Sequence, residues 1–190
     1  MNIKDSNGKN KLFAETKVLL SAAGLMWVLQ IINLLSNNYL NQFGILPREL
    51  SHLIGIIFAP FLHGNLFHII ANTLPFIILG FLVQQTKHLL TVSVSVTLIG
   101  GLLVWLFGRG SYHIGASGLI MGYFGFLLSH AYFTRTMRSI VIAVATGLIY
   151  GGLIFSLLDF RGHISFEGHI FGFLTGVGTA WGLKNLNRTK

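Results

Sequence analysis

The stretch Leu89–Phe107, LLTVSVSVTLIGGLLVWLF, contains no charged residue and is long enough to cross a membrane as one helix. The whole chain shares this character, since 53% of its residues are hydrophobic and 9% are charged, against about 25% charged in soluble proteins. We therefore predict an all-α polytopic membrane protein in which residues 1–190 form a single domain of six transmembrane helices. The predicted spans are Val18–Leu35, His63–Val83, Leu89–Phe107, Ser117–Phe133, Ser139–Leu158 and Gly168–Leu183.

The basic residues predict how the chain is oriented in the membrane. The formal net charge is +8, but Lys and Arg occur singly or in small groups between apolar runs, which argues against a nucleic-acid partner. A cytoplasmic N-terminus places ten of the thirteen Lys and Arg residues on the cytoplasmic side, leaving Arg48, Arg109 and Arg161 outside. Both termini are then cytoplasmic, with residues 1–17 forming a short N-terminal segment.

The first outer connection, residues 36–62, is unusually apolar for a solvated loop. Phe43, Leu53 and Phe58 are typical of its side chains, and Pro47 and Pro60 divide it into short pieces. We expect this segment to lie in the membrane interface as an amphipathic hairpin between the first two spans.

The polar residues within the predicted spans are few, and they are the first candidates for function because such groups are costly in lipid. The spans contain no Asp, Glu, Lys or Arg, and the chain has no Cys, so covalent chemistry must use Ser, Thr, His or Lys. The second, fourth and sixth spans all begin at the outer face. His68, Asn72, Ser117 and His169 therefore share one depth, whereas His130 lies at the inner end.

Taken singly, these residues have ordinary structural interpretations. His68 and Asn72 are four residues apart on one helix face and could form interhelical hydrogen bonds. Ser117, within Gly115-Ala-Ser-Gly118, could be only a small packing residue, and His169 could be a structural histidine.

Small residues at helical spacing change this interpretation, because they predict that the fourth and sixth spans pack closely. Ser117 and His169 would then meet at the outer ends of the two spans, as a nucleophile beside its base. His68, Asn72 and backbone N–H groups could stabilise an oxyanion. The small residues are Gly118, Gly122, Gly125 and Ser129 on one span, and Gly168, Gly172, Gly176 and Ala180 on the other.

A carboxylate behind His169 would complete a triad, and Glu167 and Asp159 are the candidates. We expect both acids to belong to a solvated loop. The sequence therefore predicts a Ser-His dyad.

Three motifs in this order resemble the rhomboid intramembrane serine proteases, specifically the short bacterial type without an N-terminal cytoplasmic domain. The motifs are His63-Gly-Asn-Leu-Phe-His68-Ile-Ile-Ala-Asn72, Gly115-Ala-Ser-Gly118 and His169-Ile-Phe-Gly172. The resemblance implies a serine endopeptidase with Ser117 as nucleophile and His169 as base. It assigns transition-state stabilisation to His68 and Asn72, with His63, Gly115, Gly118 and Gly172 in support.

The resemblance also implies a setting for this activity. Substrates would be membrane proteins with a helix-destabilised transmembrane segment, cleaved without a cofactor or metal through an acyl-enzyme. The protein would lie in the bacterial inner membrane, in contact with the lipid bilayer, with its site opening to the periplasm. The fifth span and the loop from Asp159 to Glu167 would form a movable gate and cap.

The chain departs from the family pattern at three places. Met121 stands where the family usually carries a Tyr that stacks on the catalytic His. Gln84 and Thr86 replace a Glu-x-Arg pattern at the end of the second span, and Ile54-Gly55 replaces a Trp-Arg pair in the first outer loop.

Two other functions fit parts of the pattern. A transporter or channel could have a cavity lined by His and Asn, although no charged residue marks a path through the inner half of the membrane. A metal-dependent hydrolase could use His63, His68 and His169 as ligands, although the chain lacks the His-Glu-x-x-His pattern.

Overall fold

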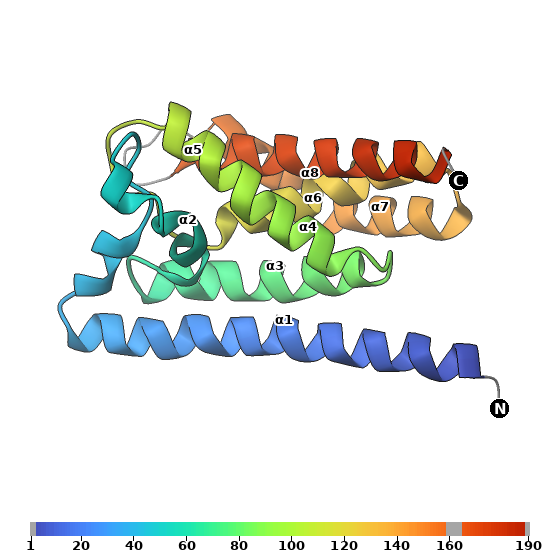
Figure 1. Ribbon diagram of the computed structural model, residues 1–190, viewed down its shortest axis with the longest axis horizontal. Helices are drawn as coiled ribbons and strands as arrows, with labels where there is room; N and C mark the ends of the chain where they lie inside the picture. The colour runs from blue at the N-terminus through green and yellow to red at the C-terminus, as the bar shows by residue number, and fades with distance from the viewer. Residues whose placement is uncertain (1–2, 159–164, 189–190) are drawn as a thin grey trace.

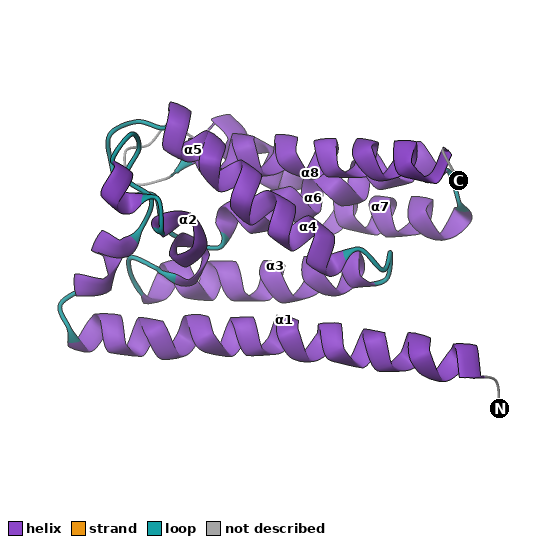
Figure 2. Ribbon diagram, viewed as in Figure 1, coloured by secondary structure: helices purple, strands orange, loops and turns teal. Residues whose placement is uncertain are grey.

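The computed structural model describes residues 3–158 and 165–188, and within them it contains helices and no strand (Figure 2). The helices form a bundle that crosses from end to end six times (Figure 1). This confirms the predicted fold class. The crossings are α1 (Ile3–Leu35), α3 (Leu66–Gln84), the run of α4 (Leu89–Ser95), η4 (Val96–Gly100) and α5 (Gly101–Phe107), α6 (Ser117–Thr134), α7 (Met137–Tyr150) with η5 (Gly151–Leu158), and α8 (Phe166–Arg188).

The centre of the bundle is formed by α6 packed against α8. Side chains on both faces of α6, such as Tyr123 and Phe126, are buried. Among the described residues, four crossings are long and apolar enough to span a membrane by length and composition, and α6 and α8 are not among them. Their glycines and polar residues lower their hydropathy, and this is tolerated because these helices face protein more than lipid. The four crossings are Asn10–Leu35, Leu66–Gln84, Leu89–Phe107 and Met137–Leu157.

The first two crossings begin in ways that the predicted spans do not describe. α1 begins at Ile3, so the lysine-bearing segment before the predicted span Val18–Leu35 continues the first helix. α3 begins at Leu66 because the Asn65 side chain accepts a hydrogen bond from the His68 N–H at 2.8 Å and caps the helix. His63 therefore lies in the loop before α3.

The outer segment 36–62 is a series of short helical pieces rather than a simple hairpin. Its backbone pairs with the loop before α6 through an isolated antiparallel bridge between Ile45 and His113. Leu50, Ile54 and Ile57 remain exposed, which suits the predicted place in the membrane interface. The pieces are η1 (Tyr39–Phe43), η2 (Leu50–His52), α2 (Gly55–Phe58) and η3 (Ala59–Phe61).

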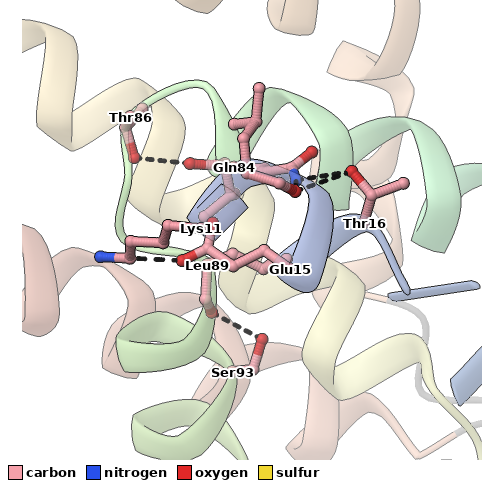
Figure 3. Close-up of polar contacts among 9 residues, drawn as sticks. Lys11, Glu15, Thr16, Gln84, Thr86, Leu89 and Ser93 are labelled. Atoms are coloured by element: carbon pink, nitrogen blue, oxygen red, sulfur yellow. Dashed lines mark hydrogen bonds and ion pairs between the residues drawn. The ribbon is translucent and has the colours of Figure 1, made fainter. Parts of the chain in front are cut away.

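At the end of the bundle that we predict to face the cytoplasm, polar contacts join α1 to the end of α3 (Figure 3). Gln84 Nε2, at the end of α3, donates to the Leu12 carbonyl at 2.6 Å and to Thr16 Oγ1 at 2.8 Å. Both acceptors belong to α1. Thr86 Oγ1 donates to the Val83 carbonyl at 2.6 Å. Gln84 thus ties two helices together where the family pattern has an acid.

Candidate active site

Ser117 is the first residue of α6 and is half-buried at the outer end of the bundle. It lines a cavity of about 60 Å³ together with Gly115, Gly118 and Gly172. Among the described residues, the N-cap residue Ala116 supplies no side-chain cap to α6, so the first N–H groups of this helix lie uncapped beside the hydroxyl of Ser117. The position therefore combines a hydroxyl, backbone donors and a space that a small group can enter.

The loop before Ser117 requires glycine at position 115. Gly115 has a φ of +113°, in the region that side-chain-bearing residues rarely adopt. A Cβ at Gly115 would also lie 2.7 Å from His68 Nε2. The glycine thus lets the loop turn into α6 while the His68 ring lies directly against it.

The two glycine faces predicted from sequence do pack together at the outer ends of α6 and α8. A Cβ on Gly118 would lie 3.2 Å from the Gly168 carbonyl oxygen, and a Cβ on Gly172 would overlap the Gly118 carbonyl oxygen. Ser117 and His169 are the residues next to Gly118 and Gly168. Among the described residues, no hydrogen bond joins the Ser117 hydroxyl to the His169 ring.

The His169 ring is buried and is oriented by the fifth crossing. Its Nδ1 lies 3.1 Å from the Ser156 carbonyl oxygen in η5. Because a carbonyl only accepts, Nδ1 carries the proton, and Nε2 of the neutral ring is left with a lone pair. A backbone carbonyl therefore fixes the tautomer that a base acting through Nε2 requires.

The prediction that Glu167 lies in a solvated loop was wrong. Its side chain is 8% exposed and its Oε1 lies 3.4 Å from Arg109 Nε. Oε1 also accepts the Arg109 backbone N–H at 3.2 Å. The carboxylate is buried because this double contact with Arg109 offsets the loss of hydration. Asp159 lies outside the described residues.

His68 presents a donor to the loop before Ser117. The Gly64 N–H donates to His68 Nδ1 at 3.4 Å, so the ring proton of neutral His68 resides on Nε2. That nitrogen is the one beside Gly115. His68 is thus placed and protonated to donate toward the start of α6.

Asn72 and His63 are also buried close to this end of α3. Asn72 Nδ2 donates to the His68 carbonyl at 2.8 Å, which occupies part of its donor capacity. His63 Nε2 accepts the Ala116 N–H at 3.5 Å, and its ring centroid lies 5.0 Å from that of His68. His63 thus supports the backbone immediately before Ser117.

Only some of the predicted site residues line the cavity beside Ser117. His68, Asn72 and His169 lie outside its lining, which is shared with the outer segment and the third crossing. Within the described part of the chain, no group of three or more His, Asp or Glu residues could hold a metal ion. A metal centre built from His63, His68 and His169 is therefore not assembled in this conformation.

Met121 takes the place of the expected Tyr without contacting solvent. It is 1% exposed, and the Ser156 hydroxyl donates toward its sulfur at 3.7 Å. Ser156 thus approaches Met121 through its side chain and His169 through its carbonyl. Sequence patterns could not predict the contact with His169, because every residue has a backbone carbonyl.

Sequence reasoning also missed a second Ser-His contact at this end. His113 Nδ1 lies 2.7 Å from Ser165 Oγ, and His113 Nε2 lies 3.1 Å from the Arg109 carbonyl oxygen. Burial lowers the pKa of His113 below its ordinary value, against the raising effects of the Arg109 carbonyl and the Glu167 charge. The only available signal was spacing, since each residue lies four positions before a predicted dyad member.

Comparison with known proteins gives one family match and several relatives. Residues 50–186 match the Rhomboid domain. An uncharacterized protein of Mycobacterium bovis is 36% identical over 174 residues, covering 86% of this chain and 72% of that protein. One of Mycobacterium leprae is 34% identical over 174 residues, covering 86% and 69%. RHOMBOID-like protein 1 of Arabidopsis thaliana is 29% identical over 118 residues, covering 60% and 30%.

Proposed function

Because this chain belongs to the rhomboid family, we propose that it is an intramembrane serine endopeptidase with Ser117 as nucleophile and His169 as general base. The observation that carries the assignment is the contact between Gly118 and Gly168, which brings the backbones next to Ser117 and His169 together. Catalytic hydrogen bonds are often long or absent without substrate and form in the Michaelis complex. We therefore expect the Ser117–His169 hydrogen bond to form when substrate binds.

The first half of the reaction forms an acyl-enzyme. Ser117 Oγ attacks the scissile carbonyl carbon while its proton passes to His169 Nε2. The Ser156 carbonyl, which accepts from His169 Nδ1–H, stabilises the resulting imidazolium in place of a carboxylate. Collapse of the tetrahedral intermediate breaks the C–N bond, and His169 returns the proton to the leaving amine.

The second half regenerates the enzyme with water. His169 accepts a proton from the water as it attacks the ester, and the proton then passes to Ser117 as the new carboxyl end leaves. In both halves the oxyanion would receive hydrogen bonds from N–H groups at the start of α6, from His68 Nε2 and from the remaining N–H of Asn72. Asn72 is buried and His68 is half-buried, and the low dielectric of such a setting strengthens these bonds.

The substrates we propose are membrane proteins whose transmembrane segment is weakened by Gly or Pro near the outer interface. Attack requires an extended peptide bond at Ser117, which a stable helix does not present. The fifth crossing is the proposed entry gate, and the loop from Asp159 to Glu167 is the proposed cap. Residues 159–164 of this loop lie outside the described residues. The proposed setting is a bacterial inner membrane, with both termini cytoplasmic and the site opening outward.

Cleavage of a transmembrane reporter by the detergent-solubilised full chain tests this proposal. Ser117→Ala and His169→Ala should each lower kcat at least about a thousandfold, because nucleophile and base act as one unit. Ser129→Ala on α6 and His130→Ala at the inner end are matched controls and should retain activity. A chelator should have no effect, and a fluorophosphonate should label the wild-type protein but not Ser117→Ala.

Two results would contradict the assignment. Chelator-sensitive cleavage that survives Ser117→Ala would favour a metal-dependent hydrolase. Substrate flux across vesicles with no cleavage under any condition would favour a transporter.

A further inference from the structure

A second pair of polar side chains links the segments that carry the dyad. Ser165 and His113 lie 52 residues apart, on the two sides of the outer end, and their side chains are 2.7 Å apart. His113 precedes Ser117 by four residues, and Ser165 precedes His169 by four residues. The contact therefore joins the loop that leads into α6 to the start of α8.

The direction of this hydrogen bond follows from the partners of His113. The Arg109 carbonyl, 3.1 Å from Nε2, can only accept, so Nε2 carries the ring proton. Nδ1 of the neutral ring is then the acceptor, and the Ser165 hydroxyl donates to it. His113 is held further through its backbone, which exchanges hydrogen bonds with Ile45 at 2.8 and 3.1 Å.

Ser165 transmits this constraint to His169. Its Oγ accepts the Gly168 N–H at 3.2 Å, in the manner of a helix N-cap, and its carbonyl accepts the His169 N–H at 3.2 Å. The same residue thus contacts His113, the first turn of α8 and the backbone of the proposed base. Rotation of this turn about the α8 axis would require one of these bonds to break.

A second link runs parallel to the first. Arg109, in the same loop as His113, contacts the carboxylate of Glu167 in the first turn of α8 through both its backbone N–H and its side chain. Its guanidinium also lies over the Phe166 ring, with Cζ 5.1 Å from the centroid. The loop and the turn are therefore fixed at two points on the outer side.

We propose that His113 and Ser165 are positioning residues that set the register between the nucleophile loop and the base helix. The proposal rests on the proposed function of Ser117 and His169. Neither residue of the link needs to touch the substrate. Their contact keeps His169 in the correct rotational position as the substrate enters.

The use of Ser165 Oγ as a helix cap favours this role over that of a second nucleophile. One of its lone pairs already accepts the Gly168 N–H, which makes attack on a carbonyl less favourable. Because His113 and Ser165 both line the cavity beside Ser117, a covalent probe can reach Ser165 and would label it if it were a nucleophile.

The test is a double-mutant cycle in the full chain, with Ser165→Ala, His113→Ala and the double variant assayed on the same reporter. Each single change should lower kcat by about tenfold to a hundredfold, since small displacements of catalytic groups have effects of this size, and leave KM within about twofold. The double variant should be no slower than the slower single variant. Ser165→Thr, which keeps the hydroxyl, should recover most of the activity.

Several outcomes would overturn the proposal. Unchanged kcat in both single variants, or fully additive losses in the double variant, would show that the contact does not position the dyad. Fluorophosphonate labelling of Ser165 in Ser117→Ala would make Ser165 a nucleophile instead. A wild-type protein that neither cleaves nor takes up the probe would refute the proposed function itself, whereas an active wild type with insensitive variants refutes only the link.

Discussion

The seam between α6 and α8 and the contact between η5 and α8 approach the proposed base in different ways. In the seam, backbone meets backbone, because Gly172 and Gly176 have no side chain to separate the helices. At η5, one residue, Ser156, reaches His169 through its carbonyl. The α6–α8 contact can change only if a whole helix moves, whereas the Ser156–His169 contact depends on the short segment η5.

The fifth crossing, which contains η5, is also less buried than the second crossing. Within the fifth crossing, Met137–Leu157, 6% of the residues in its 18-residue apolar window are buried, against 33% in the corresponding window of the second crossing, Leu66–Gln84. The fifth crossing therefore faces lipid along most of its length. The seam between α6 and α8 thus positions the backbone of the proposed dyad. The fifth crossing, which is less buried, orients the ring of the proposed base.

The largest effect we expect comes from filling the seam. Gly172→Ala places a methyl group on the Gly118 carbonyl oxygen, which cannot move because it belongs to a packed helix. We expect a loss of stability of about 3 kcal/mol, at the upper end of overpacking effects, with loss of cleavage. Thermal unfolding in detergent and the reporter assay measure the two effects.

The matched control is Gly182→Ala, on the same helix, where a Cβ would meet nothing within 4 Å. It should leave stability and activity unchanged. Gly152→Ala, in η5, also has open space and should behave likewise. Equal destabilisation by all three changes would remove the distinction between seam and periphery.

The fold was accessible from sequence because its main signals are local. Apolar length predicts a crossing, and small residues four apart predict the α6–α8 face, without knowledge of distant partners. The predicted span Val18–Leu35 says nothing of the helix before it, because lysines mark where lipid ends and a helix can continue beyond that point. The start of α3 was missed because Asn65, not hydropathy, decides it.

The site was accessible only in part, for a physical reason. His68, Asn72, Ser117 and His169 were selected because polar groups in lipid are costly. Glu167 was misjudged because its burial depends on Arg109, 58 residues earlier in the chain. The Ser156 contact uses a carbonyl that every residue possesses, so no pattern of side chains predicts it.

An effect of intermediate size is expected on the pH dependence of stability, through His113 in the loop before α6. Burial holds the pKa of His113 below its ordinary 6.5, so the unfolded chain binds a proton at a pH where the folded chain does not. The stability from neutral His113 is therefore complete above pH 6.5 and is lost as pH falls through the folded pKa. The groups that act on His113 are the Arg109 carbonyl, Glu167 and the Arg109 charge.

The measurement is the thermal midpoint of the wild type and of His113→Asn between pH 7.5 and about 5. The wild type should lose more stability on acidification than the variant, because only its His113 must be protonated. Other histidines titrate in both proteins and cancel in the difference. Parallel curves would show that His113 does not carry this pH dependence.

The smallest effect we expect comes from Ser156 in η5, where the role of the side chain can be separated from that of the carbonyl. Ser156→Ala removes the hydroxyl that approaches Met121 but keeps the carbonyl that accepts from His169. Since the proposed role belongs to the carbonyl, kcat should stay within about threefold, the scale of one modest hydrogen bond. Ser156→Pro should be far more damaging, because the ring displaces the local helix and with it the carbonyl. If Ser156→Ala lowers kcat as much as Ser156→Pro, the Ser156 side chain and not its backbone orients His169. The fifth crossing would then act on His169 through the contact of Ser156 with Met121.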